Sequence, residues 1–140
     1  MSTGIEALDR SLQPTDPWLD DLMTRLGTGD RHLASLALRT TRQALRDRLT
    51  VNEAAHLGAQ LPMLIRGFYY GGWHPAGKPL KEHAKEAFLA HVGGEAHAQG
   101  FDPEPAARAV FGLLAARIAA GEIEDVTSVL PGPIRELWPE

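Results

Sequence analysis

The 140-residue sequence predicts an all-α protein, and three observations lead to this fold class. Apolar residues recur three and four positions apart through most of the chain, as they do along the buried face of a helix. Short polar residues that cap helix N-termini stand before these segments. No segment alternates apolar and polar residues in the way of a half-buried strand.

A second pattern is an internal repeat. The segment LRDRLTVNEAAHLGAQLPMLIRGFYY, from Leu45, is echoed by LAARIAAGEIEDVTSVLPGPIRELWP, from Leu114. The matched pairs are Leu45/Leu114, Arg48/Arg117, Glu53/Glu122, Leu61/Leu130, Pro62/Pro131, Ile65/Ile134 and Arg66/Arg135. Such self-similarity is typical of a duplicated unit, here of three to four helices. Because so small a unit buries little surface alone, we expect the tandem copies to pack as one compact helical bundle with pseudo-two-fold symmetry.

The repeat also sets the expected boundaries. A glycine- and proline-rich segment, GGWHPAGKP, separates the two similar parts and is typical of a connection. The chain then divides into a tail (1–15), a first helical repeat (16–70), a Gly/Pro/Trp linker (71–79) and a second helical repeat (80–140).

The first repeat should open with a helix capped by Asp16, because Pro17 fits the first helical turn. This helix should stop at the glycines that follow Leu26. Asp30 should cap a longer helix that runs to about Leu49.

The remaining helices follow the same rules. Thr50 and Glu53 match a capping box, and Pro62 suits the start of a short helix. In the second repeat we expect one helix around Glu82–Ala96 and another capped by Asp102. The core residues that the spacing predicts are Leu19, Leu22, Met23, Leu26, Leu33, Ala37, Leu38, Thr41, Ala44, Leu45, Leu49, Ala54, Leu57, Leu61, Ile65, Phe68, Tyr69, Phe88, Leu89, Val92, Ala107, Val110, Phe111, Leu114 and Ile118.

Composition narrows the classes of function. The net charge of −4 and the isoelectric point of about 5.8 argue against a protein whose main task is to neutralise nucleic-acid phosphates. The absence of cysteine excludes disulfides and thiolate chemistry. The sequence has no signal-peptide pattern and no apolar run long enough to span a membrane. We therefore expect a soluble, cytoplasmic protein with no membrane partner.

No catalytic, metal or cofactor motif stands out, so the sequence favours a non-enzymatic module that binds a protein partner or itself. The candidate interaction surface is the aromatic segment at the start of the Gly/Pro/Trp linker, with Arg66, Tyr69, Tyr70, Trp73 and His74. The alternative interpretation is that these rings pack between the two repeats.

Two other functions remain open. Nucleic acid could bind an arginine-rich helix face made of Arg31, Arg39, Arg42 and Arg46. A small ligand or an enzyme site could lie between the two repeats. Histidines at 83, 91 and 97 lack the spacing of a metal motif, and we expect the repeated arginines and glutamates to stabilise the fold.

The segment LRDRLTVNEAAHLGAQLPMLIRGFYYGGWHPAGKP and the later GEIEDVTSVLPGPIRELWP together resemble a bacterial family of uncharacterised proteins, domain of unknown function 2267. The resemblance covers the chain from about Trp18 and implies a small helical protein with a duplicated unit. It associates the chain with a stress-related role but supplies no activity or site residues. Gly71 stands where relatives are expected to carry an acidic residue.

Overall fold

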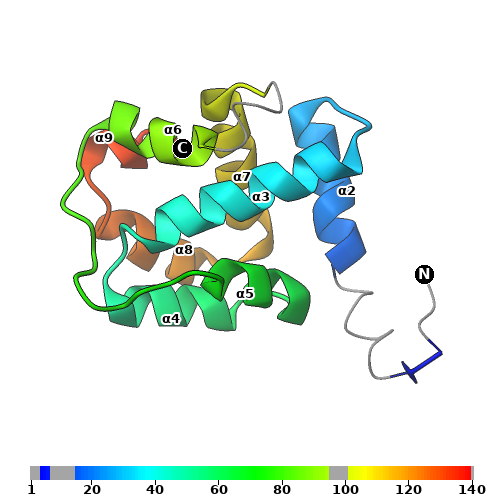
Figure 1. Ribbon diagram of the computed structural model, residues 1–140, viewed down its shortest axis with the longest axis horizontal. Coiled ribbons are helices and arrows are strands. Elements are labelled where there is room, and N and C mark those ends of the chain that lie inside the picture. The colour runs from blue at the N-terminus through cyan, green and yellow to red at the C-terminus, as the bar shows by residue number, and fades with distance from the viewer. Residues whose placement is uncertain (1–3, 7–14, 95–100, 140) are drawn as a thin grey trace.

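The computed structural model describes residues 4–6, 15–94 and 101–139, and these ranges are helical with no strand (Figure 1). The helices are α2 (Thr15–Leu26), α3 (Arg31–Arg46), α4 (Val51–Ala59), α5 (Met63–Tyr70), α6 (Lys85–Gly93), α7 (Pro103–Arg117), α8 (Ala120–Ser128) and α9 (Gly132–Arg135). The all-α prediction is therefore confirmed. Most of the predicted tail lies outside the described residues.

The helices surround α3, which crosses the middle of the molecule and contacts α2, α5, α6 and α7 (Figure 1). Helices from the first predicted repeat also pack against helices from the second. The first helix, α2, packs against α7, and α6 packs against α3, while α4 lies beside α8. Buried apolar residues from all these helices form one continuous core. None of the described helices is long and apolar enough to cross a membrane.

Three of the predicted helix caps are confirmed. The Asp30 carboxylate accepts hydrogen bonds from the backbone N–H groups of His32 and Leu33. The Thr50 hydroxyl accepts from the backbone N–H of Glu53. The Asp102 carboxylate accepts from the N–H of Glu104 in the same way. These bonds satisfy donors that a helix start leaves without an intrahelical partner.

Several predicted boundaries were wrong. Helix α2 begins at Thr15, so Asp16 lies in its first turn instead of capping it. Helix α3 ends at Arg46 instead of about Leu49. The helix predicted at Glu82–Ala96 runs from Lys85 to Gly93, and Ala96 is outside the described residues. Terminal turns carry few packing contacts, so spacing alone defines them poorly.

Most of the predicted core is confirmed, with one clear error. The predicted core residues are buried except for Phe68 and for five that are only partly buried, Leu19, Met23, Leu26, Leu33 and Leu89. Phe68 is 53% exposed. Helix α5 packs through Ile65 and Tyr69, which are four residues apart and lie on the same face. Phe68 is rotated about 100° from Tyr69 around the helix axis, so it points away from the core.

Candidate functional site

The aromatic residues at the end of α5 and in the linker mainly pack α5 against α4. Tyr69 is fully buried, and its hydroxyl donates a hydrogen bond of 2.7 Å to the Ala54 carbonyl. Burial raises the pKa of the Tyr69 phenol well above its ordinary value, so the group stays a neutral donor. The Tyr70 ring lies 5.0 Å from that of Tyr69 and 5.4 Å from that of Trp73, centroid to centroid. The rings therefore pack, but these contacts join α5 to α4 within the first repeat and do not connect one repeat to the other.

A glycine makes this packing possible. A Cβ atom at Gly58 would lie 2.3 Å from the Tyr70 hydroxyl oxygen and 3.1 Å from the Tyr69 ring. No side chain other than hydrogen fits at that distance, so Gly58 allows the two tyrosine rings to approach α4 closely. Of the five residues predicted as an interaction surface, only Arg66 and His74 are exposed.

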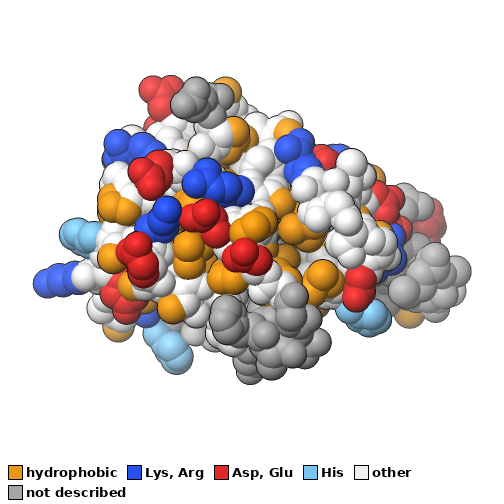
Figure 2. Space-filling model, turned by 90° about the horizontal axis from the view of Figure 1, so that it is seen from above, with side chains coloured by type: hydrophobic (Ala, Val, Ile, Leu, Met, Phe, Trp, Pro, Cys, Tyr) orange, Lys and Arg blue, Asp and Glu red, His pale blue; other side chains and the backbone are white. Residues whose placement is uncertain are grey.

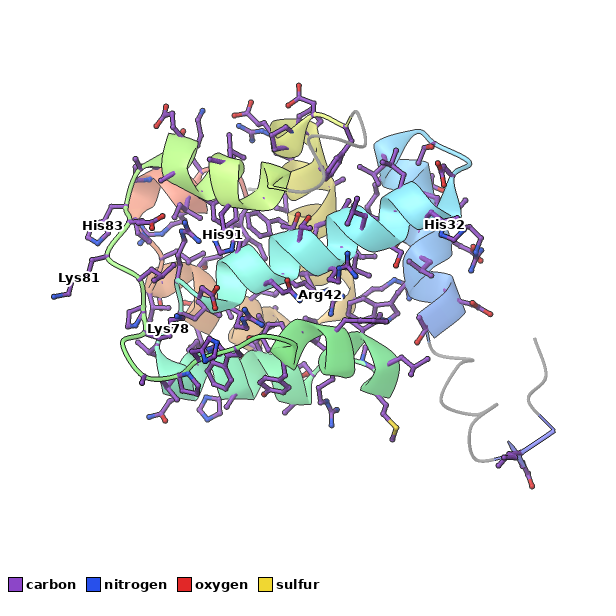
Figure 3. The ribbon with its side chains drawn as sticks, in the orientation of Figure 1. His32, Arg42, Lys78, Lys81, His83 and His91 are labelled. Atoms are coloured by element: carbon purple, nitrogen blue, oxygen red, sulfur yellow. The ribbon has the colours of Figure 1, made fainter. Side chains whose placement is uncertain are left out.

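The arginine face predicted on α3 is largely internal. Arg42 is 1% exposed; its guanidinium donates to the carbonyls of Leu38 and Ile65 and lies between α3 and α5 (Figure 3). Burial lowers its pKa to about 9, which still leaves it charged at neutral pH. Arg46 is 4% exposed and donates to the carbonyls of Tyr69 and Gly71 at 2.8 and 2.7 Å. Both arginines therefore bind the α5 backbone and do not reach solvent.

The other two arginines of that face are at the surface. Arg31 forms ion pairs with Asp16 at 3.1 Å and Asp20 at 2.9 Å. Arg39 is partly buried, and no hydrogen bond or ion pair connects it to a described residue. Seen from above, basic, acidic and apolar side chains are mixed on the visible face (Figure 2).

The repeated arginines have structural contacts, which sequence reasoning anticipated. Arg66 donates to the carbonyls of Ala59 and Leu61, at 3.2 and 2.9 Å. Its counterpart Arg135 donates to the carbonyls of Thr127 and Leu130, both at 2.8 Å. Each arginine thus satisfies carbonyls at the end of the preceding helix.

The second arginine pair has diverged. Arg48 is buried against the Phe88 ring and pairs with Glu82 at 2.7 Å. It also lies 2.9 Å from His91 Nδ1, across the contact between α3 and α6. Arg117 instead reaches the carboxylate of Asp21 at 3.1 Å and the carbonyl of Pro17 at 3.2 Å. In both cases the arginine connects distant parts of the chain.

The repeated glutamates meet face to face where α4 lies beside α8. One carboxylate oxygen from each of Glu53, Glu122 and Asp125 lies within 4.8 Å of the others, and no other such group of acids or histidines was found in the described ranges. Burial, followed by a hydrogen bond with Glu53 and the charges of Glu53 and Asp125, raises the pKa of Glu122 to about 7. The Glu122 carboxyl therefore changes its protonation state near neutral pH. Sequence reasoning noted the matched glutamates but did not place them in contact.

The histidines predicted without a metal role are dispersed. His91 bonds to Arg48, and His83 lies in the connection before α6 (Figure 3). His97 is outside the described residues.

The exposed face of α5 was not anticipated. Met63 is 66% exposed and Phe68 is 53% exposed, while Leu64 is partly exposed between them. The buried Ile65 and Tyr69 mark the opposite side, and Gly67 lies at the centre of the outward side. The sequence does carry a signal for this face. Leu64 and Phe68 are four residues apart and so share a helix face, and each directly precedes a residue of the buried pair Ile65 and Tyr69, which lies on another face.

A search of the curated proteins found no match to this chain. A family model does match it, over residues 15–137, and that model describes an uncharacterized conserved protein, DUF2267. The match spans every described helix. The chain therefore belongs to the DUF2267 family.

Proposed function

We propose that this protein is a non-enzymatic helical module that acts through protein–protein contact, and that two copies associate through the outer face of α5. The observation that carries the proposal is the exposure of Phe68, 53%, on a helix of eight residues. Most large apolar side chains of the described ranges are instead packed in or against the core.

The centre of this face favours a close helix contact. A Cβ atom added to Gly67 would meet no other atom within 4 Å, so nothing inside the fold requires glycine there. Glycine in a helix costs about 1 kcal/mol relative to alanine. A second helix that approaches the α5 backbone closely would explain why that cost is tolerated.

The same face can pair with itself. Two-fold dimers bury the same patch on both subunits, so a second copy supplies Leu64 and Phe68 against Leu64 and Phe68. Helix α5 carries no acidic residue, and its one charged side chain, Arg66, is bound to the end of α4. The face is therefore apolar without a charge that would have to be buried at the contact.

Sedimentation equilibrium of the purified chain tests this proposal. We expect a dimer whose dissociation constant rises at least about tenfold in Phe68→Ser, which corresponds to a loss of 1.4 kcal/mol. Val129→Ser is the matched control, because Val129 is also apolar and 42% exposed but lies far from α5 in sequence, at the C-cap of α8. A wild-type chain that stays monomeric, or equal weakening by both variants, would contradict self-association through α5.

We also infer that the two helical units are copies of one ancestral unit related by a pseudo-two-fold axis. Three pairs of contacts support this inference. Arg66 and Arg135 bind equivalent helix ends, and Glu53 faces Glu122 where α4 meets α8. Helix α2 packs on α7 as α6 packs on α3.

A further inference from the structure

A polar hollow lies between α3 and α6. It has a volume of about 360 Å³ and is lined by Arg39, Thr40 and Gln43 from α3 and by His91 from α6. One wall therefore comes from a helix before the Gly/Pro/Trp linker and the other from a helix after it. The volume is within the range of sites that hold small molecules, although its lining is more polar than most.

Arg39 gives this hollow a positive charge that no residue of the described ranges pairs with. Among the arginines in the described part of the chain, it alone has neither a hydrogen bond nor an ion pair. The sequence from Ser35 to Gln43 contains no acid, so no carboxylate on the neighbouring turns of α3 can pair with it. A partly buried guanidinium usually has a partner, because its five N–H donors lose water on burial.

His91 adds a neutral donor. The Arg48 guanidinium can only donate, so the Nδ1 atom that lies 2.9 Å from it must accept, and the ring proton stays on Nε2. Burial and the charge of Arg48 lower the pKa of His91, which favours this neutral form. Its Nε2 atom is 3.9 Å from the Asp47 carboxylate, too far for a hydrogen bond. That N–H is therefore available to a ligand.

The other two side chains supply acceptors. The Gln43 amide nitrogen donates to the Phe68 carbonyl, which leaves the amide oxygen of Gln43 available. The Thr40 hydroxyl donates to the Leu36 carbonyl at 3.0 Å and retains lone pairs that can accept.

The surrounding charges do not neutralise Arg39. The charged groups that act on His91 are Arg46 and Asp47 at the end of α3, Arg48, and Glu82 before α6. Two are positive and two are negative, and they are paired with one another, Arg46 with Asp47 and Arg48 with Glu82. Among the described residues, these four charges therefore leave that of Arg39 without a partner.

We propose that the hollow between α3 and α6 binds a small anion whose carboxylate or phosphate group pairs with Arg39. His91 Nε2 donates a second hydrogen bond to the anion. Gln43 and Thr40 accept hydrogen bonds from hydroxyl or amide groups on the rest of the ligand. A planar guanidinium binds either kind of anionic group through two parallel hydrogen bonds. The ligand would contact both α3 and α6 and so reinforce their packing.

Amide NMR titrations test the site with two probes, potassium phosphate and potassium acetate, each against potassium chloride at equal ionic strength. We expect saturable shifts of the Arg39, Thr40, Gln43 and His91 signals with at least one probe. Arg39→Gln should weaken that response about tenfold or more, because it removes a charge-assisted bidentate contact. Arg31→Gln is the matched control, since it removes the same charge from the same helix outside the hollow.

The probes also separate the two ligand chemistries. If only phosphate saturates the site, the ligand is a phosphate ester. If only acetate does, the ligand is a carboxylate, and if both do, the site binds anions in general. The proposal is overturned if neither probe shifts these amide signals more than chloride does. It is also overturned if the signals of Arg39→Gln shift as much as those of the wild type. Because Arg39 makes no hydrogen bond or ion pair with the described part of the chain, that variant should remain folded, as its unchanged dispersion of amide signals would verify. The result is independent of dimerisation through α5.

Discussion

Replacing Glu122 by glutamine removes a carboxyl whose pKa is raised by burial and by its contact with Glu53. The pKa of Glu122 is raised from 4.5 to about 7, so the folded chain holds this proton more tightly than the unfolded chain. The stabilising contribution of the protonated group is complete below pH 4.5 and is lost as the pH rises through 7. The wild-type protein should therefore lose stability between about pH 5 and pH 8.5 through this group.

The magnitude follows from the pKa shift after correction for exposure. A shift of this size would be worth about 3 kcal/mol for a fully buried group. Glu122 is only partly buried, so screening by solvent reduces the expected effect to about 1 kcal/mol. Glutamine is neutral at every pH and can donate its amide N–H to Glu53. Glu122→Gln should therefore be about 1 kcal/mol more stable than the wild type at pH 8.5 and nearly equal to it at pH 5.

Urea denaturation at several pH values measures this difference. The wild-type and variant chains are compared at each pH, which cancels the opposite contribution of His91. The pKa of His91 is lowered, so its contribution is lost as the pH falls below about 6.5. Glu124→Gln is the control, because Glu124 is an exposed acid on the same helix. The reasoning is refuted if the difference between wild type and Glu122→Gln does not change with pH, or if Glu124→Gln shows the same change.

Three further substitutions test the fold by thermal and urea denaturation. Leu45→Ala and Leu114→Ala each truncate a fully buried side chain and should each cost about 2–5 kcal/mol; unchanged melting temperatures would contradict the core assignment. Gly58→Ala should cost about 1–3 kcal/mol through overlap with Tyr70, and Tyr70→Phe in the same chain should recover part of the loss. Arg42→Met should cost about 1–3 kcal/mol because it leaves buried carbonyls without donors; a variant as stable as the wild type would show that packing replaces those bonds.

The local features of the fold were predictable because they depend on residues close in sequence. Asp30, Thr50 and Asp102 mark helix starts, since each side chain reaches donors two or three residues ahead. The buried stripe of α3 could be read for the same reason, because its spacing repeats over a long helix.

The candidate sites were less predictable because they depend on which helices meet. Arg42 and Arg46 have the spacing of a surface row, yet α5 covers them, and only that tertiary contact supplies the carbonyls they bind. Phe68 was assigned to the core because a helix of eight residues gives too few positions to define its phase. The contact of Glu53 with Glu122 depends on the pairing of α4 with α8, which the repeat suggests but does not fix.

The packing of α2 on α7 determines the order in which the chain can fold during synthesis. Trp18 and Leu22 are buried, and Arg117 reaches back to Asp21 across 96 positions of sequence. A nascent chain on the ribosome completes α2 long before α7 has emerged, and until then α2 has only α3 of its two main neighbours to pack against. The native core therefore forms only after α7 has left the ribosome, and the early helices are the segments that a chaperone would meet first.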